Sequence, residues 1–213
     1  MSVLENFKKI KDNVNKINVN TTIIAISKTF SLQHIRPLID FGHLHYGENK
    51  VQETSDKWSD LLNVNSSLKL HLVGKLQSNK AYDAVKLFSY IHSLDNEKLA
   101  LKLAKSEKEL SKKLSYFIQV NFHDEQQKSG ISEKNLSNFI KFCKVENNLN
   151  LIGLMCLPPV NIDPTDYFLR LKHLAKEFNL DQLSMGMSGD YKNAIKCGST
   201  YIRIGSSIFG NRS

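Results

Sequence analysis

Short apolar runs alternate with amphipathic segments along the whole sequence, and this alternation restricts the possible folds more than any other feature. Each run is followed by a segment with apolar residues at helical spacing. Such alternation predicts parallel strands joined by right-handed helical crossovers. Eight units in 213 residues predict a single α/β domain over residues 1–213, a (β/α)8 TIM barrel, with a doubly wound open sheet as the alternative. The expected strands are 23–27, 43–47, 68–73, 90–92, 115–120, 151–155, 182–185 and 201–204.

Boundary signals support this division of the chain. Apolar residues recur at helical spacing from Val3 to Ile17, so an additional N-terminal helix precedes the first strand. Pro37 falls inside the second helix and is expected to kink or shorten it. Side chains that suit helix starts are expected to begin four further helices. These starts are Ser31, Asp95, Ser132 and the pair Asp163-Pro164.

Composition excludes several classes of protein. The net charge of +8 could indicate a nucleic-acid partner, but its lysines are scattered and no nucleic-acid-binding motif accompanies them. No apolar run approaches the ~20 residues that span a bilayer, and residues 1–16 lack the apolar core of a signal peptide. Cys143, Cys156 and Cys197 are far apart, lack metal-ligand spacing and suit a reducing compartment. We therefore expect a cytoplasmic protein without metal, membrane or nucleic acid.

Lys28 directly follows the first expected strand, whose apolar residues 23–26 predict burial on both faces. The carboxyl ends of barrel strands are where ligands bind. A lysine that is partly desolvated there loses its proton more easily and can form a Schiff base with an aldehyde. Taken alone, Lys28 is better explained as a strand-end lysine that reaches solvent, and the rest of the chain reverses this preference.

Two glycine-serine turns follow the last two expected strands, where barrels usually bind phosphate. Ser188 contributes a hydroxyl, and backbone N–H groups from Gly205 and Ser206 suit an anion. Either turn alone is a common feature. Together with Lys28 they indicate a ligand that carries both an aldehyde and a phosphate, and pyridoxal 5'-phosphate (PLP) fits. Arg203, on the preceding strand, is placed to meet the pyridine nitrogen.

Other polar residues have weaker interpretations. His43 and His45 share one strand face, as metal ligands can, but no acidic or cysteine partner is evident, so packing or hydrogen bonding is favoured. A role near the ligand and a role in bracing the loop stay equally open for His71, Gln77, Asn79 and Lys80. The methionines at strand ends are expected to be packing groups. These are Met155, Met185 and Met187.

Seven segments, in order, resemble those of the pyridoxal phosphate homeostasis protein family, from about Ile23 to Arg212. They are AISKT, HYGENKVQE, HLVGKLQSNK, KSGI, GLMCLPP, LSMGMSGDYKNAI and YIRIGSSIFG. The resemblance implies a barrel similar to the N-terminal domain of bacterial alanine racemase, with PLP bound through Lys28. It also implies a role in vitamin B6 balance without established catalytic activity. The positions that match the family's cofactor pocket are Asn49, Ser188, Arg203, Gly205 and Ser206.

The expected function is therefore to hold PLP or to deliver it to PLP-dependent apo-enzymes, as a monomer with no catalytic residue. The alternative is a PLP-dependent enzyme such as an amino-acid racemase. Racemisation needs an acid/base group on each face of the substrate. The resembled racemases take their second base, a tyrosine, from an added β-domain of a partner subunit. Only Asn211, Arg212 and Ser213 follow Gly210, so no such domain is expected.

Overall fold

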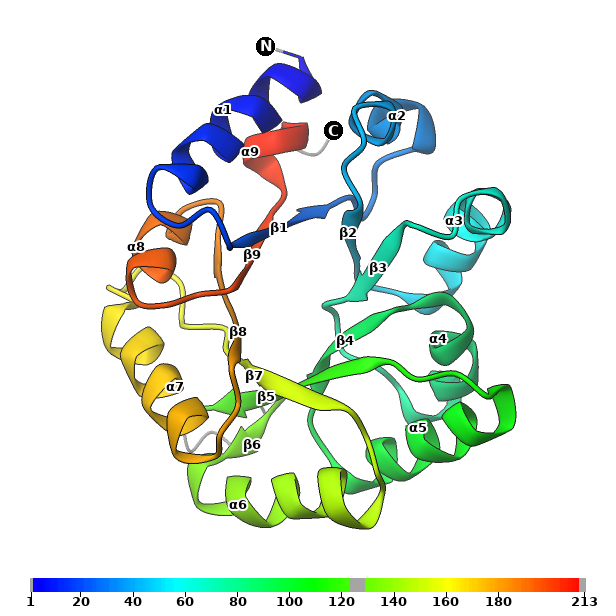
Figure 1. Ribbon diagram of the computed structural model, residues 1–213, viewed down its shortest axis with the longest axis vertical. Helices are drawn as coiled ribbons and strands as arrows, with labels where there is room; N and C mark the ends of the chain where they lie inside the picture. The colour runs from blue at the N-terminus through cyan, green and yellow to red at the C-terminus, as the bar shows by residue number, and fades with distance from the viewer. Residues whose placement is uncertain (1, 123–128, 211–213) are drawn as a thin grey trace.

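The protein forms a closed barrel of parallel strands surrounded by helices (Figure 1). The computed structural model describes residues 2–122 and 129–210, so Lys128 of the KSGI segment and residues 211–213 lie outside the described residues. Within those ranges eight strands pair in the order β4-β3-β2-β1-β9-β8-β7-β5, and β4 pairs with β5 to close the ring. The strands are β1 (Thr22–Ile26), β2 (His45–Glu48), β3 (Lys69–Leu72), β4 (Tyr90–Leu94), β5 (Ser115–Asn121), β7 (Leu151–Met155), β8 (Gln182–Met187) and β9 (Tyr201–Ile204). The predicted (β/α)8 barrel is confirmed, and the open sheet is wrong.

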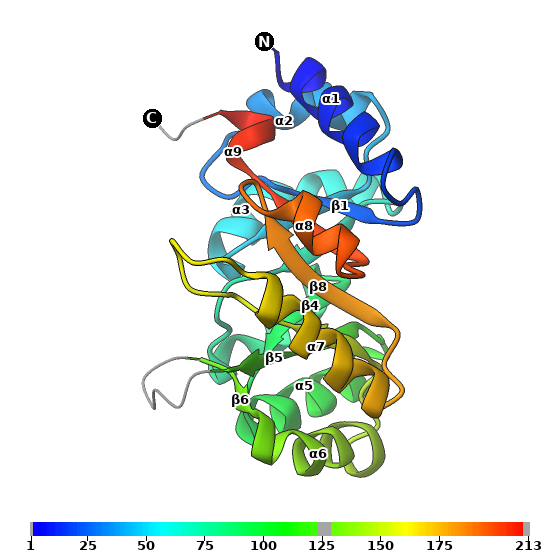
Figure 2. The same cartoon turned by 90° about the vertical axis from the view of Figure 1, so that its left-hand side faces the viewer.

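Helices cover the outer face of the barrel strands, and the inner faces of the strands pack against one another inside the closed ring. They are α1 (Val3–Asn15), α2 (Leu32–Asp40), α3 (Val51–Val64), α4 (Ala81–Leu87), α5 (Glu97–Leu110), α6 (Glu133–Lys141), α7 (Thr165–Glu177), α8 (Tyr191–Lys196) and α9 (Ser206–Phe209). The predicted N-terminal helix is α1, which begins with a capping box between Ser2 and Glu5. It lies beside α9 in both views, and the Asn6 side chain donates to the Ile208 carbonyl at 3.1 Å (Figure 2).

The first and last strands of the barrel lie side by side, because β1 pairs with β9 in register Ile24 to Arg203 and Ala25 to Ile204. In β1, Ile23, Ile24 and Ala25 are buried, as predicted for a strand that is covered on both faces. Since all strands are parallel, their carboxyl ends meet at one mouth of the barrel. This pairing therefore brings the residues that follow β1 next to those that follow β9.

Several local predictions differ from the structure. Asn96 caps α5, not Asp95, because the Asn96 side-chain oxygen accepts from the Leu99 N–H at 2.9 Å. Ser132 occupies the N-cap position of α6, but its hydroxyl makes no capping bond. Pro37 lies inside α2, as predicted, and the helix ends at Asp40, three residues later.

Other differences concern boundaries. Helix α7 begins at Thr165, one residue after Pro164, and the Asp163 carboxylate accepts from the Thr165 N–H at 3.0 Å. An additional two-residue strand, β6 (Ile131–Ser132), pairs with β5 outside the barrel. No helix in the described ranges combines the length and apolar character needed to cross a bilayer.

Candidate functional site

A cavity of about 550 Å³ lies where the carboxyl ends of β1 and β9 meet. All six residues that the sequence predicts for a ligand line this one cavity. They are Lys28, Asn49, Ser188, Arg203, Gly205 and Ser206. The other lining residues are mostly apolar and were not predicted as site residues: Ile26, Phe30, Val73, Leu157, Met187 and Gly210. Met187 is 39% exposed and lines the cavity, whereas Met155 and Met185 are buried, as predicted for packing groups.

Lys28 lies in the turn that follows β1 and is half-buried. The turn is held at its start, because the Ser27 N–H donates to the Gly47 carbonyl at 3.0 Å. Thr29 has a φ of +70°, a left-handed conformation that a β-branched residue rarely adopts. This tight turn directs the chain away from the strand at the residue that carries the amine.

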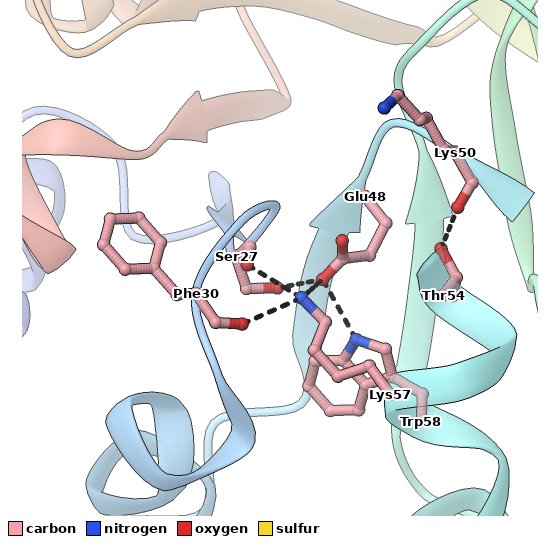
Figure 3. A network of polar contacts seen from close by, with 7 residues as sticks. All are labelled: Ser27, Phe30, Glu48, Lys50, Thr54, Lys57 and Trp58. Carbon is pink, nitrogen blue, oxygen red and sulfur yellow. Dashed lines mark hydrogen bonds and ion pairs between the residues drawn. The ribbon is translucent and has the colours of Figure 1, made fainter. Parts of the chain in front are cut away.

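A buried polar network fixes the same turn from the side of β2 and α3 (Figure 3). The Glu48 carboxylate, 1% exposed, accepts from the Ser27 hydroxyl at 2.7 Å and from the Trp58 indole at 3.0 Å. The Lys57 ammonium lies 2.7 Å from the same carboxylate oxygen. These contacts satisfy a carboxylate that would otherwise be costly to bury.

Lys57 also reaches across to the backbone on both sides of Lys28 (Figure 3). Its ammonium donates to the Ser27 carbonyl at 2.9 Å and to the Phe30 carbonyl at 3.2 Å. Sequence reasoning missed this role, since Lys57 lies in an ordinary amphipathic helix. The one available signal was Glu48, an acidic residue at the end of a strand that is otherwise expected to be buried.

Asn49 follows β2 and packs closely against the loop after β3. A Cβ on Gly74 would lie 2.3 Å from the Asn49 carbonyl oxygen, so only glycine permits this approach. The Ser93 hydroxyl donates to the Gly74 carbonyl at 2.6 Å and holds the loop in place. Asn49 is therefore positioned by the backbone of the loop after β3, which a side chain of β4 holds in place.

At the ends of β8 and β9, two backbone donors converge on one oxygen. The Ser188 hydroxyl accepts from the Gly205 N–H at 3.3 Å and from the Ser207 N–H at 3.5 Å. Converging backbone N–H groups near a hydroxyl suit a phosphate oxygen. This donor set therefore fits the anionic end of the predicted ligand.

Arg203 is buried, and its guanidinium is held by atoms of the barrel wall. Nη1 donates to the carbonyl and to the hydroxyl of Ser184, both at 2.8 Å, and Nη2 donates to the Cys156 carbonyl at 3.0 Å. Burial lowers the pKa of Arg203, but a guanidinium still stays protonated. Among the ion pairs of the described residues, none involves Arg203. A buried cation thus lines the cavity.

The histidines lie apart from the cavity lining. His43 bonds to the His45 carbonyl at 2.9 Å, and His45 bonds to His71 at 3.0 Å, which confirms their predicted hydrogen-bonding role. Burial lowers the pKa of His43 to about 4. In the described ranges, no group of histidine, cysteine and acidic side chains could hold a metal ion. The remaining loop candidates, Gln77, Asn79 and Lys80, do not line the cavity either.

The chain is similar to proteins of one family over nearly its whole length. The sequence profile described as "Alanine racemase, N-terminal domain" matches residues 2–213. The pyridoxal phosphate homeostasis protein of Synechocystis sp. is 36% identical over 199 residues, 89% of this chain and 91% of that protein. The protein of the same name from Escherichia coli K12 is 34% identical over 200 residues, 90% of this chain and 86% of that protein.

Solved structures agree with this relationship. PipY from Synechococcus elongatus, determined with PLP bound, superposes with a TM-score of 0.90 at 30% identity, covering 98% of this chain and 100% of PipY. An alanine racemase from Clostridium difficile shares the fold at 13% identity, with a TM-score of 0.72, and 57% of its length is covered. The chain therefore belongs to the alanine racemase N-terminal domain family and, within it, to the pyridoxal phosphate homeostasis proteins.

Proposed function

We propose that this protein binds PLP in the cavity and holds or delivers it in vitamin B6 homeostasis. One observation carries the proposal: side chains suited to an aldehyde, a phosphate and a ring nitrogen line the same cavity. The PLP-bound structure of PipY supports it, since PipY is 30% identical and has the same fold.

Each part of the cavity has a role in this proposal. Lys28 supplies the amine that captures the aldehyde, and Ser188, Gly205 and Ser206 bind the phosphate. Arg203 donates to the ring nitrogen, while apolar lining residues cover the ring and exclude water. When bound, PLP supplies an aldehyde that a lysine can hold covalently and a ring that withdraws electrons from an attached amine.

Gly205→Val tests the phosphate end of the cavity. Gly205 has a φ of −115°, and an added Cβ would lie 3.4 Å from Ile26, so a side chain there should not prevent folding. Its branches would occupy space that the phosphate needs. We expect the affinity for PLP, measured by absorbance titration, to fall at least tenfold, about 1.4 kcal/mol. Pyridoxal, which lacks the phosphate, should bind both proteins weakly and equally. Equal affinity of the wild type for PLP and pyridoxal would refute the phosphate site.

We propose further that the protein does not turn over amino acids. Among the described residues that line the cavity, Lys28 is the one side chain able to exchange a proton near neutral pH. Racemisation needs a second such group on the opposite face of the substrate. Arg203 keeps its proton and only donates hydrogen bonds, so it does not protonate the ring nitrogen and deepen the electron sink.

Proton exchange at an amino acid tests this second part. We expect the PLP-loaded protein to exchange the Cα proton of L-alanine in D2O far more slowly than an enzyme would, because the described lining of the cavity offers no second base. The loss of the Cα–H signal is followed by NMR, with an alanine racemase as the positive control. Exchange or D-alanine formation above ~1 per second would make the protein an enzyme.

The proposed setting is the cytoplasm, with PLP-dependent apo-enzymes as recipients and a monomer as the active form. The three cysteines are all buried and unpaired, which suits a reducing compartment. Since Lys28 holds PLP covalently but reversibly, transfer to another lysine requires only exchange between amines.

A further inference from the structure

A chain of hydrogen bonds crosses the interior of the barrel and ends on Arg203. His45 Nδ1 lies 3.0 Å from His71 Nε2, and His71 Nδ1 lies 2.9 Å from His92 Nε2. His92 Nδ1 lies 2.8 Å from the Ser184 hydroxyl, which accepts from Arg203 Nη1 at 2.8 Å. Five side chains thus form one continuous line from the start of β2 to the wall of the cavity.

The barrel geometry makes this line possible. His71, His92, Ser184 and Arg203 are each the third residue of their strands, β3, β4, β8 and β9. Between β4 and β8 lie β5 and β7, so the bond from His92 to Ser184 spans the barrel interior. His45 begins β2 and is half-buried, so the line ends near the opposite mouth of the barrel.

The surroundings keep the histidines neutral. His71 and His92 are both 0% exposed; His71 stacks on Tyr90 with ring centroids 4.2 Å apart, and His92 stacks on Phe117 at 4.3 Å. Burial lowers the pKa of all three histidines in the line. A neutral imidazole has one donor nitrogen and one acceptor nitrogen. Each ring in the line must therefore donate to one neighbour and accept from the other. All the hydrogen bonds of the line then run in the same direction.

Arg203 fixes that direction, because a guanidinium only donates. Ser184 accepts from Arg203, so its own proton is available for His92 Nδ1. His92 then carries its proton on Nε2 and donates to His71, which in the same way donates from Nε2 to His45. If the line ran in the opposite direction, the Ser184 hydroxyl would accept from both His92 and Arg203, and its own proton would need a third partner. Among the described residues, the side-chain oxygen of Ser184 forms hydrogen bonds with His92 and Arg203.

We propose that Ser184 and His92 are positioning residues for Arg203, which hold its guanidinium toward the cavity through a line of hydrogen bonds that runs in one direction. Ser184 keeps Nη1 at the barrel wall and the Cys156 carbonyl accepts from Nη2, so the remaining N–H groups of the guanidinium are available to the ligand. Because the Ser184 hydroxyl donates its proton to His92, its oxygen always presents a lone pair to Arg203 Nη1. The direction of the line is independent of any ligand, whereas the consequence for PLP rests on the proposed function.

The direction of the hydrogen-bond line is tested by determining which nitrogen of each histidine carries the proton. In the full-length protein labelled with ¹⁵N-histidine, long-range proton–nitrogen NMR spectra separate the two neutral tautomers and the charged form. We expect His45, His71 and His92 to be neutral with the proton on Nε2, with or without added PLP. Single histidine-to-glutamine variants assign the signals among the seven histidines of the chain. A proton on Nδ1 of His92, or a charged ring there, would overturn the proposal.

Serine variants test the effect on Arg203. Ser184→Ala removes the donor to His92 and one of the two acceptors for Nη1, leaving the Ser184 carbonyl, so we expect a mixture of His92 tautomers and at least a tenfold loss of PLP affinity. Ser184→Thr keeps a hydroxyl and should retain the Nε2 tautomer and most of the affinity. Ser199→Ala is the matched control, because Ser199 is equally buried and its hydroxyl bonds to the Met185 carbonyl on the same strand β8.

The outcomes separate the two proposals. If Ser184→Ala behaves like Ser199→Ala in both measurements, Ser184 is a packing residue and the inference is wrong. If the His92 tautomer changes while PLP affinity does not, the line exists but does not position Arg203, and the inference is also wrong. A wild-type protein that fails to bind PLP would refute the proposed function, and the tautomers would still decide the direction of the line.

Discussion

Lys28→Ala is expected to abolish covalent retention of PLP. In the wild type, borohydride reduction should fix the cofactor to the peptide that contains Lys28, which mass spectrometry identifies. The variant should keep no label and lose the absorbance of the bound cofactor. Since the remaining contacts are only hydrogen bonds and packing, we expect PLP affinity to fall at least a hundredfold, about 2.8 kcal/mol.

Lys50→Ala provides the control for this experiment. Lys50 follows Asn49 closely, and its side chain is 72% exposed in an ion pair with Glu53, so its loss should leave the label in place. Recovery of the label on another lysine of the wild type, such as Lys57, would contradict the assignment. Absence of label on any wild-type lysine would do the same.

Lys57→Met is expected to have the largest effect on stability. It removes the cation from a Glu48 carboxylate that is 1% exposed, and breaking a buried pair by removing one partner costs several kcal/mol. We expect the free energy of unfolding, from urea denaturation, to decrease by about 3 kcal/mol. PLP affinity should also decrease, because the carbonyls of Ser27 and Phe30 lose the donor that fixes the Lys28 turn.

A double variant separates these two effects. Adding Glu48→Gln to Lys57→Met removes the unpaired charge while keeping acceptors for Ser27 and Trp58, so much of the stability should return. PLP affinity should stay low, since the turn is still unsupported. Lys105→Met is the surface control, because its pair with Glu109 is exposed and should contribute less than about 0.5 kcal/mol. If Lys57→Met and the wild type unfold at the same urea concentration, the predicted loss of stability is contradicted.

Local patterns were sufficient to predict the barrel and the residues around its cavity. Strands such as β1 are contiguous apolar runs, and glycine, serine or lysine marks their ends. Periodicity therefore indicates the strands, and turn chemistry indicates where they end. Because parallel strands end at one mouth, Lys28 and Gly205 could be placed together without knowledge of any contact. This one topological rule groups Lys28, Ser188, Arg203, Gly205 and Ser206, whereas Asn49 was assigned through the family resemblance.

Contacts between distant polar side chains could not be predicted in this way. Lys57 looks like any solvent-facing helix residue, and only the folded chain shows that it bonds to the carbonyls beside Lys28. The line from His45 to Arg203 depends on the stagger of five strands, which the sequence does not display. The cap of α5 was misplaced by one residue, because Asp95 and Asn96 both suit an N-cap and only backbone geometry distinguishes them.

The pairing of β1 with β9 also has a consequence for biosynthesis. Lys28 leaves the ribosome early, whereas Arg203 and Gly205 are among the last described residues to be made, roughly ten to thirty-five seconds later at ~5–20 residues per second. Until β9 is added, β1 has an open edge that can pair wrongly, and the cavity lacks one wall. Nascent chains that lack β9 are therefore expected to bind PLP more weakly than the complete protein, because Arg203, Gly205 and Ser206 are absent from the cavity.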